Sequence, residues 1–270
     1  MIDSHCHSSF SIDSQMPPAQ LMATALEKGI LYVALTDHID FGPSGHRFDP
    51  SEYFLHLRAE RENWPQLQIA IGVEMGIQKT HASMVNEFLA DQPYDFVIGS
   101  MHRAADIDFA VGDFLPGISR DEAWLCYWEE TLASMKSCPD FDVLGHADII
   151  RRYFSLKGTT VPAGARPVVS QVLQWLVERE KGLEINTSGI RYGLGEWHPQ
   201  LWMIEEFFAL GGKIVTIGSD SHSPDQLGFQ VDQVLGQLSE IGFQEVAFFL
   251  NRKPHFLKIT DLLADFGRAR

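Results

Sequence analysis

The stretch IDSHCH at residues 2–7 decides the fold, because it places Asp3, His5 and His7 at every second position. Successive side chains of a β-strand point to opposite faces of its sheet, so these three residues would share one face. We therefore expect a strand that carries one acid and two imidazoles to its carboxyl end.

Six further apolar runs along the chain end in polar residues in the same way. In chain order the seven expected strands are IDSHCH (2–7), YVALTDH (32–38), QIAIGVE (68–74), DFVIGSMH (95–102), DVLGHAD (142–148), GLEINTS (182–188) and KIVTIGSDSH (213–222). Amphipathic, helix-like patterns lie between them, at 18–28, 51–63, 80–91, 119–137, 165–181 and 199–210, with a last one near 231–241.

Alternating strands and helices predict an α/β fold with a parallel sheet. Periodicity alone does not separate an open sheet from a closed barrel. In an open sheet, the chemistry gathers at the one crevice where the strand order reverses, whereas the strands of a barrel all end at one mouth. Because almost every strand here ends in polar residues, we expect a distorted (β/α)7 TIM-like barrel, formed by one domain over residues 1–270.

The strand ends carry six of the eleven histidines and two acids. The residues concerned are His5, His7, His38, Glu74, His102, His146, Asp220 and His222. A single histidine such as His102 is more simply explained as a core residue that hydrogen-bonds there. Six imidazoles and two carboxylates in one mouth would leave many polar groups poorly paired, each at a cost of about 1–3 kcal/mol.

Divalent cations resolve this problem, since neutral imidazole and carboxylate are ligands for zinc, manganese and iron. Eight ligands exceed what one ion takes, so two or three metal ions are expected at the carboxyl ends of the strands. A carboxylate can bridge two ions, and Glu74 or Asp220 would do so. Adjacent ions about 3.5–4 Å apart can share a hydroxide that is a nucleophile near neutral pH.

The composition excludes several other classes of protein. The formal net charge of −15 argues against a non-specific nucleic-acid binder, which needs a basic surface. No run approaches the roughly 20 apolar residues of a membrane span, and the first ten residues do not resemble a signal peptide. Cys6, Cys126 and Cys138 are widely scattered, so we expect no disulfide framework and a reduced, cytoplasmic protein.

The ordered motifs resemble those of the PHP (polymerase and histidinol phosphatase) family. The motifs are Asp3-Ser-His5-Cys-His7, Thr36-Asp37-His38, Gly72-Val-Glu74, Gly99-Ser-Met-His102, Gly145-His146-Ala-Asp148 and Ser219-Asp220-Ser-His222. The family resemblance implies a distorted (β/α)7 barrel with a trinuclear metal centre that cleaves phosphoesters. The segments 145–152 and 184–191 are similar to the histidinol-phosphatase branch.

The resemblance also implies how the ligands divide among the ions. One ion would take His5, His7, Glu74 and Asp220, and a second would share Glu74 with His102 and His146. A third would take His38, His222 and Asp13, although Asp13 could instead cap or turn the loop before Pro17. Catalytic roles are expected for Glu74, Asp220 and His222.

Other residues are expected to act around the ions. The guanidinium group matches phosphate with two parallel hydrogen bonds, so Arg191, Arg152 and Arg151 are the candidates for substrate binding. Asp3 and Asp148 share strand faces with ligands and are expected to orient imidazoles through their second ring nitrogen. His46 could reach the substrate. The remaining histidines, His56, His81, His198 and His255, are interpreted as surface residues.

The expected reaction is hydrolysis of L-histidinol phosphate to L-histidinol and phosphate through a metal-bridging hydroxide. A PHP phosphoesterase for another small phosphate ester, such as a nucleotide or a sugar phosphate, is the alternative. The acidic balance disfavours a nuclease, and the intact ligand set disfavours a non-catalytic domain. Metal-dependent amide hydrolysis on a similar barrel is disfavoured because no lysine closes a strand. The expected partner is a small phosphate ester, with no nucleic acid and no membrane; oligomeric state is not predicted.

Overall fold

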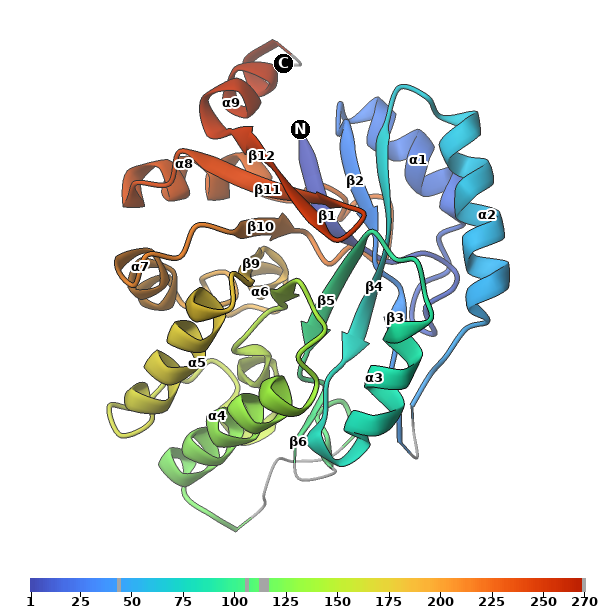
Figure 1. The fold of residues 1–270 in the computed structure, drawn as a ribbon. Helices are drawn as coiled ribbons and strands as arrows, with labels where there is room; N and C mark the ends of the chain where they lie inside the picture. The colour runs from blue at the N-terminus through green and yellow to red at the C-terminus, as the bar shows by residue number, and fades with distance from the viewer. Residues whose placement is uncertain (43–44, 105–106, 112–116, 269–270) are drawn as a thin grey trace.

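The computed structural model describes residues 1–42, 45–104, 107–111 and 117–268. Its centre is a parallel sheet whose strands lie side by side in chain order, β1-β2-β4-β5-β8-β9-β10 (Figure 1). These strands are β1 (Ile2–Cys6), β2 (Tyr32–Leu35), β4 (Gln68–Gly76), β5 (Phe96–Ser100), β8 (Val143–Leu144), β9 (Gly182–Asn186) and β10 (Val215–Gly218). They are the seven strands that the sequence predicts, and their sequential order is that of a βα barrel.

Backbone hydrogen bonds after β10 return the sheet to β1. The amide of Asp220 donates to the carbonyl of His5 at 2.8 Å, and the amide of His7 donates to the carbonyl of Ser221 at 2.8 Å. A short extra strand, β3 (His38–Ile39), extends the β2 side and pairs with β4. The sheet is therefore a nearly closed, distorted barrel, which confirms the predicted fold class.

Helices cover the outside of this barrel (Figure 1). The long ones coincide with the predicted helical patterns: α1 (Pro18–Glu27), α2 (Pro50–Asn63), α3 (Ala82–Ala90), α4 (Arg120–Ser137), α5 (Arg166–Glu178), α7 (Leu201–Ala209) and α8 (Val231–Ile241). Shorter helical turns follow strands at the mouth: η1 (Lys79–His81), η2 (Ile149–Arg152), η3 (Phe154–Leu156) and α6 (Ser188–Arg191). Helix α4 begins in a capping box, in which Ser119 and Glu122 each accept the other's backbone amide proton.

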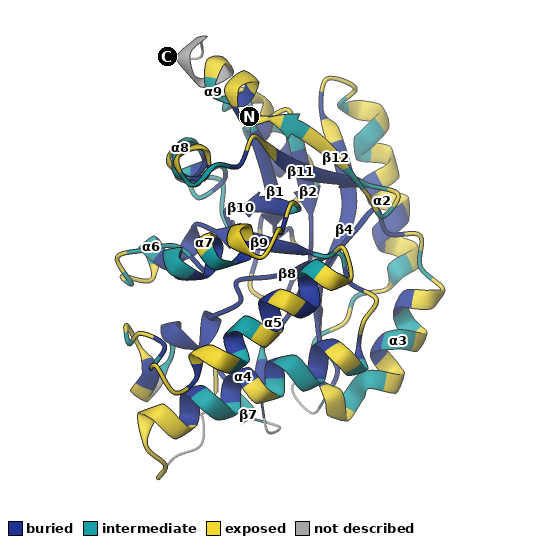
Figure 2. Cartoon of the chain, turned by 60° about the vertical axis from the view of Figure 1, so that its left-hand side comes forward, coloured by how far each residue is buried: buried dark blue, intermediate teal, exposed yellow. Residues whose placement is uncertain are grey.

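The barrel strands are almost wholly buried, and each outer helix has one buried and one exposed side (Figure 2). Trp124 and Trp128 of α4 are among the largest fully buried side chains of the core. All three cysteines are free thiols, as the sequence predicts. Because both faces of the barrel strands are buried, the strand ends are the places where polar side chains can meet a ligand.

A carboxyl-terminal unit that the sequence did not predict closes the other end of the barrel. It consists of a hairpin, β11 (Glu245–Leu250) and β12 (Lys253–Lys258), followed by α9 (Ile259–Arg268). Phe248 packs edge-on against Tyr32 with ring centroids 5.5 Å apart, and Phe249 stacks on Phe96 at 5.0 Å. Tyr32 and Phe96 open β2 and β5, so the hairpin covers the amino ends of the strands and leaves the carboxyl ends accessible.

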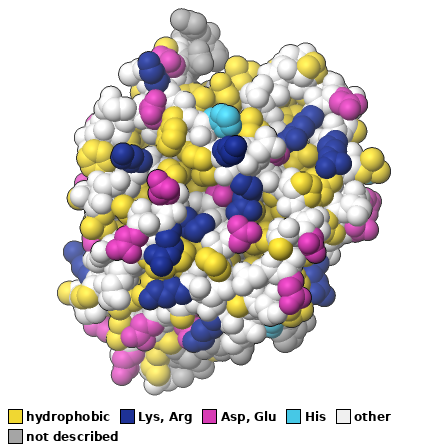
Figure 3. Space-filling model, viewed as in Figure 1, with side chains coloured by type: hydrophobic (Ala, Val, Ile, Leu, Met, Phe, Trp, Pro, Cys, Tyr) yellow, Lys and Arg dark blue, Asp and Glu magenta, His cyan; other side chains and the backbone are white. Residues whose placement is uncertain are grey.

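Within the described ranges, none of the helices combines the length and apolarity that a membrane crossing requires. On the face shown in Figure 3, lysine and arginine side chains are interspersed with aspartate and glutamate.

A second small hairpin, β6 (Arg103–Ala104) and β7 (Ile107–Asp108), lies after β5 on the mouth side.

Candidate metal centre

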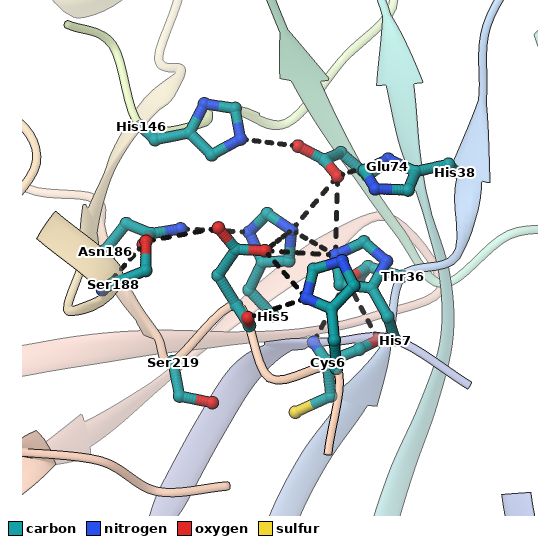
Figure 4. Close-up of polar contacts among 12 residues, drawn as sticks. His5, Cys6, His7, Thr36, His38, Glu74, His146, Asn186, Ser188 and Ser219 are labelled. Atoms are coloured by element: carbon teal, nitrogen blue, oxygen red, sulfur yellow. Dashed lines mark hydrogen bonds and ion pairs between the residues drawn. The ribbon is translucent and has the colours of Figure 1, made fainter. Parts of the chain in front are cut away.

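The ends of the strands bring the predicted histidines and acids into one buried cluster. Three groups of three residues each have their ligand atoms within 4.8 Å of one another. The groups are His7, His38 and His222; His5, His7 and Glu74; and His38, Glu74 and His102. His5 and His7 project to the same side, while Cys6 points away from them, as the period-two pattern predicts (Figure 4). Their assignment as metal ligands stays a prediction, but the geometry that it requires is present.

Glu74 lies at the centre of the cluster, with His146 on one side of its carboxylate and His38 on the other (Figure 4). Its Oε1 is 2.7 Å from Nε2 of His146 and 3.1 Å from Nε2 of His102. Its Oε2 is 2.8 Å from Nδ1 of His38 and 3.2 Å from Nε2 of His5. Four imidazoles therefore converge on one fully buried carboxylate, as a bridging ligand would require.

Asp220 supplies the second buried carboxylate, directly after β10. Its Oδ1 is 3.3 Å from Nε2 of His7, and its Oδ2 accepts a hydrogen bond from Nη2 of Arg152 at 2.9 Å. The backbone of Asp220 has φ 54°, a left-handed conformation that non-glycine residues rarely adopt. This conformation, held at a strand end, turns the carboxylate toward the β1 histidines.

Asp13 joins the cluster from the loop after β1. Its Oδ2 is 3.1 Å from Nε2 of His222 and 3.6 Å from Nε2 of His38. The Asp13 side chain is 52% exposed, so it lies at the solvent side of these two imidazoles. This is the place that the family resemblance gives to the third acid, and ligation by Asp13 stays a prediction.

Three groups that the sequence analysis did not select hold the second ring nitrogen of cluster histidines. Oε1 of Glu184 lies 2.5 Å from Nδ1 of His5, and Oδ1 of Asp40 lies 2.9 Å from Nδ1 of His102. The Ser11 hydroxyl lies 3.0 Å from Nδ1 of His7. That hydroxyl donates its one proton to the buried carboxylate of Asp37 at 2.7 Å, so it accepts from His7.

The prediction that Asp3 and Asp148 orient imidazoles of the cluster is wrong, because neither carboxylate contacts a ring of the cluster. The Asp3 carboxylate accepts from the Ser219 amide at 2.8 Å and from the Gly228 amide at 2.8 Å, and so it secures the closure of β10 onto β1. The Asp148 carboxylate contacts His198, which is outside the cluster. Strand periodicity showed which face these acids occupy, but not which neighbour they meet across the barrel.

The hydrogen-bond polarity of the cluster calls for cations. With the proton of each neutral ring on Nδ1, the Nε2 atoms of His5 and His7 face each other as lone pairs at 3.0 Å. The Nε2 lone pair of His102, whose Nδ1 faces Asp40, likewise faces a carboxylate oxygen of Glu74. Acceptors placed against acceptors repel unless positive charge lies between them. Divalent metal ions supply that charge, so the residues present fit a metal centre.

The field of the cluster attracts positive charge. Burial alone would lower the pKa of His5, but the carboxylates of Glu184 and Glu74 raise it well above its usual value. Burial would raise the pKa of the Glu74 carboxyl, yet the imidazoles around it, His5 first, hold it well below its usual value. Burial opposes ionisation of Asp220 as well, but the Arg152 guanidinium and the neighbouring imidazoles, His5 first, together more than offset this, so the pKa of Asp220 is also low. The same carboxylates that would hold protons on the rings would hold metal ions.

The three candidate arginines lie in different surroundings. Arg152 lines the cavity at the mouth. Arg191 donates to the backbone carbonyls of Ser219 and Asp220 at 2.7 and 2.8 Å, and it lines an adjoining pocket that shares Asp13, Tyr192 and His222 with the cavity. Arg151 is buried and paired with Asp148 and Glu196, and it is not among the residues that line the cavity.

The cavity above the cluster has a volume of about 190 Å³. The residues of the cluster that line it are Asp13, His38, His102, His146, Asp220 and His222, and Arg152 lines it as well. Phe109, Tyr153 and Tyr192 add aromatic walls. His46, the histidine expected to reach the substrate, also lines it.

Among the four histidines interpreted as surface residues, His56 and His255 are exposed and His81 is half-buried. His198 is fully buried, so that interpretation is wrong for His198. It precedes Pro199 after a Gly-rich loop, a context that resembles an exposed turn in the sequence. A backbone pairing with the end of β9, distant in the chain, draws it inside.

A parallel βα barrel with a histidine and carboxylate cluster at the carboxyl ends of its strands defines the class of metal-dependent barrel hydrolases. The PHP domain family matches residues 3–188, which is most of the barrel. The chain belongs to the PHP family.

Several relatives align over nearly the whole chain. A histidinol-phosphatase of Lactococcus lactis is 32% identical over 257 residues, covering 93% of this chain and 95% of its own. A Thermotoga maritima protein named "probable histidinol-phosphatase" is 30% identical, covering 92% and 95% respectively. A solved histidinol phosphate phosphatase of Lactococcus lactis, complexed with zinc, L-histidinol and phosphate, is 29% identical with a TM-score of 0.84, covering 94% of this chain and 98% of its own.

Proposed function

We propose that this protein is a metal-dependent phosphomonoesterase that hydrolyses L-histidinol phosphate to L-histidinol and phosphate. The observation that carries the proposal is the cluster of six imidazoles with Glu74 and Asp220 beneath a cavity that also contains Arg152. The Lactococcus lactis relatives, which share about a third of its residues and its barrel, support the choice of substrate.

The residues present would hold two or three divalent ions, and we propose zinc, manganese or iron. His5, His7 and Asp220 would serve one ion, His102 and His146 a second, and His38, His222 and Asp13 a third. Glu74 would be shared between ions, since its two oxygens face different imidazoles. Bound divalent ions act as Lewis acids, which activate water and withdraw charge from phosphoryl oxygens.

The chain's own residues prepare this site in three ways. Glu184, Asp40 and Ser11 keep the protons of His5, His102 and His7 on Nδ1, so the Nε2 atoms remain free to bind metal. Arg152, which lines the cavity, is proposed to bind the phosphate group, and Arg191, in an adjoining pocket, is proposed to bind it as it enters. The role in substrate binding predicted for Arg151 is not carried into the proposal, because its guanidinium is used by Asp148 and Glu196.

The organic part of the ester would lie against the aromatic side of the cavity. Phe109, Tyr153 and Tyr192 line that side, and aromatic rings pack favourably against an imidazole group such as that of the substrate. We further propose that residues 1–270 act as one domain in the cytoplasm on a small molecule, since the chain is acidic and its three cysteines are free thiols.

A panel of phosphate esters tests the proposal. Phosphate release is measured from L-histidinol phosphate, nucleoside monophosphates and sugar phosphates, with metal analysis of the same protein sample. We expect the highest kcat/KM for L-histidinol phosphate and about two or three divalent ions per chain. A clear preference for a nucleotide or a sugar phosphate would refute L-histidinol phosphate as the substrate. Active protein without bound metal would refute the metal-dependent mechanism.

A further inference from the structure

His198 is a buried titratable residue outside the metal cluster, and its position is fixed by the end of β9. Its amide donates to the carbonyl of Asn186 at 2.9 Å, and its carbonyl accepts from the Asn186 amide at 2.7 Å. The side chain has no exposed surface. A buried imidazole costs free energy unless both ring nitrogens are paired, so its partners indicate what it does.

The two ring nitrogens of His198 have opposite roles. Nδ1 lies against Oδ1 of Asp148, an acceptor, so Nδ1 carries the proton. Nε2 accepts a hydrogen bond from Nε of Arg152 at 3.0 Å. A guanidinium group can only donate, so the direction of this bond is fixed and the chain of contacts runs from Asp148 through His198 to Arg152.

Asp148 is itself held in place, which makes it a firm base for this chain. Its Oδ2 accepts from the Gln200 amide at 3.1 Å and faces Nη1 of Arg151 at 3.3 Å. Burial lowers the pKa of His198 to about 4, against the opposing effect of Asp148. The ring is therefore neutral near pH 7 and keeps its Nε2 lone pair for Arg152.

Arg152 is fixed on two of its three nitrogens. Besides its bond to His198, it donates from Nη2 to the Ser188 hydroxyl and to Oδ2 of Asp220, the latter at 2.9 Å. Its guanidinium lies 4.3 Å from the ring centroid of Tyr192. Within the described ranges Nη1 has no hydrogen-bond partner, and Arg152 lines the cavity above the metal cluster.

The neutral imidazole of His198 leaves the positive charge of Arg152 in place, whereas a carboxylate at that position would neutralise it. Asp220 is the one acid in contact with the guanidinium within the described part of the chain. A second acid at Nε would neutralise the positive charge and repel a phosphate dianion. An uncharged acceptor orients Nε and leaves that charge available for the ligand.

We propose that His198, oriented by Asp148, is a positioning residue that aims the guanidinium of Arg152 at the phosphate group of the substrate. The inference rests on the proposed phosphatase function, and it goes beyond that function by assigning a role to two residues that touch neither metal nor substrate. The prediction is an effect on phosphate affinity that passes through Arg152.

The test measures binding of inorganic phosphate to the zinc-loaded protein by calorimetry, together with KM and kcat. His198→Phe keeps a planar ring and removes both hydrogen bonds. We expect it to weaken phosphate binding about tenfold, equal to about 1.4 kcal/mol, and to raise KM more than it lowers kcat. His255→Phe, the same change at an exposed position, is the matched control and should leave both unchanged.

A double-mutant cycle separates positioning from a general structural effect. Arg152→Ala should weaken phosphate binding by at least as much as His198→Phe. Adding His198→Phe to Arg152→Ala should then weaken it no further, because the group on which His198 acts is gone. Independent, multiplying effects of the two changes would overturn the proposal, as would a His198→Phe protein with unaltered phosphate affinity.

If His198→Phe does not fold, Asp148→Asn is a second variant that tests the positioning role of His198. The new side-chain NH₂ group would turn toward His198, since the Gln200 amide and Arg151 are fixed donors on the other side. Nδ1 of His198 would then have to accept, which moves its proton to Nε2, against Nε of Arg152. Phosphate affinity should fall in Asp148→Asn; unchanged affinity would refute the inference.

Calorimetry also distinguishes this inference from the proposed function. Wild-type protein that binds phosphate through Arg152 and His198, but does not hydrolyse L-histidinol phosphate, would refute the substrate and support the positioning role. Wild-type protein that is zinc-loaded and binds no phosphate would refute the positioning role itself.

Discussion

The change Glu184→Gln tests how the protein prepares His5 for metal binding. Oε1 of Glu184 accepts the Nδ1 proton of His5, and Oε2 accepts from the His146 amide at 2.6 Å. The side chain is fully buried, so a glutamine in its place could not turn out to solvent. The substitution changes one oxygen to an NH₂ group and preserves the shape.

The structure determines which way that amide would turn. The His146 amide is a backbone donor that cannot change its role, so the glutamine oxygen would stay with it. The NH₂ group would then face His5, whose Nδ1 would have to accept. A neutral imidazole has one N–H, so the proton would move to Nε2 and block the lone pair that faces the cluster.

The expected loss is that of a partner that orients a metal ligand, about 10–100-fold in metal affinity. This corresponds to about 1.4–2.8 kcal/mol. The assay titrates zinc into apo-protein in competition with a coloured zinc chelator, and thermal unfolding of the apo-protein checks the fold. Glu205→Gln, the same change at an exposed site of α7, is the control and should bind zinc like the wild type. Glu184→Gln protein with wild-type zinc affinity would refute the reasoning.

Three further predictions concern other parts of the molecule. Asp13→Ala should remove one bound metal per chain by elemental analysis, because its carboxylate lies between His38 and His222; unchanged metal content would exclude ligation. Trp128→Ala should lower the free energy of unfolding in urea by about 3–5 kcal/mol, because this side chain is fully buried; a loss below about 1 kcal/mol would contradict its place in the core. Gly218→Ala should reduce zinc affinity and stability, since a Cβ there would overlap His5 and Glu184, whereas Gly236→Ala in α8 meets open space and should be neutral or stabilising. Equal effects of the two glycine changes would contradict this.

Hydrophobic pattern predicted the barrel strands well because each is short, apolar and ended by polar residues. The same pattern did not reveal the hairpin of β11 and β12. Its two-residue turn is Asn251-Arg252, and both residues have positive φ, 51° and 60°. The usual sequence signal for such a turn is Asn-Gly or Asp-Gly, and an arginine at the second position conceals it.

The site shows a similar division between local and long-range information. The period-two rule placed His5 and His7 on one face of β1, because alternation along a strand is a local property. The expected barrel then placed the ends of distant strands at one mouth. Which carboxylate meets the far nitrogen of a ring depends on register across the barrel. Glu184 and His5 are 179 residues apart in the chain.

A weaker signal for two of the missed residues was present in the sequence. Glu184 and Asn186 alternate on β9 as Asp3 and His5 do on β1, and Asp40 follows His38 by two residues. Buried acids at strand ends therefore include both predicted ligands and the groups that contact the second ring nitrogen of the cluster histidines. Only the three-dimensional arrangement separates the two kinds.

The most direct test of the account measures phosphate release from L-histidinol phosphate by protein that a chelator has stripped of metal, before and after zinc is restored. We predict no release by the stripped protein, and recovery as the cluster around Glu74 fills. Full activity of metal-free protein would contradict the account, as would a zinc-loaded protein that leaves the ester intact.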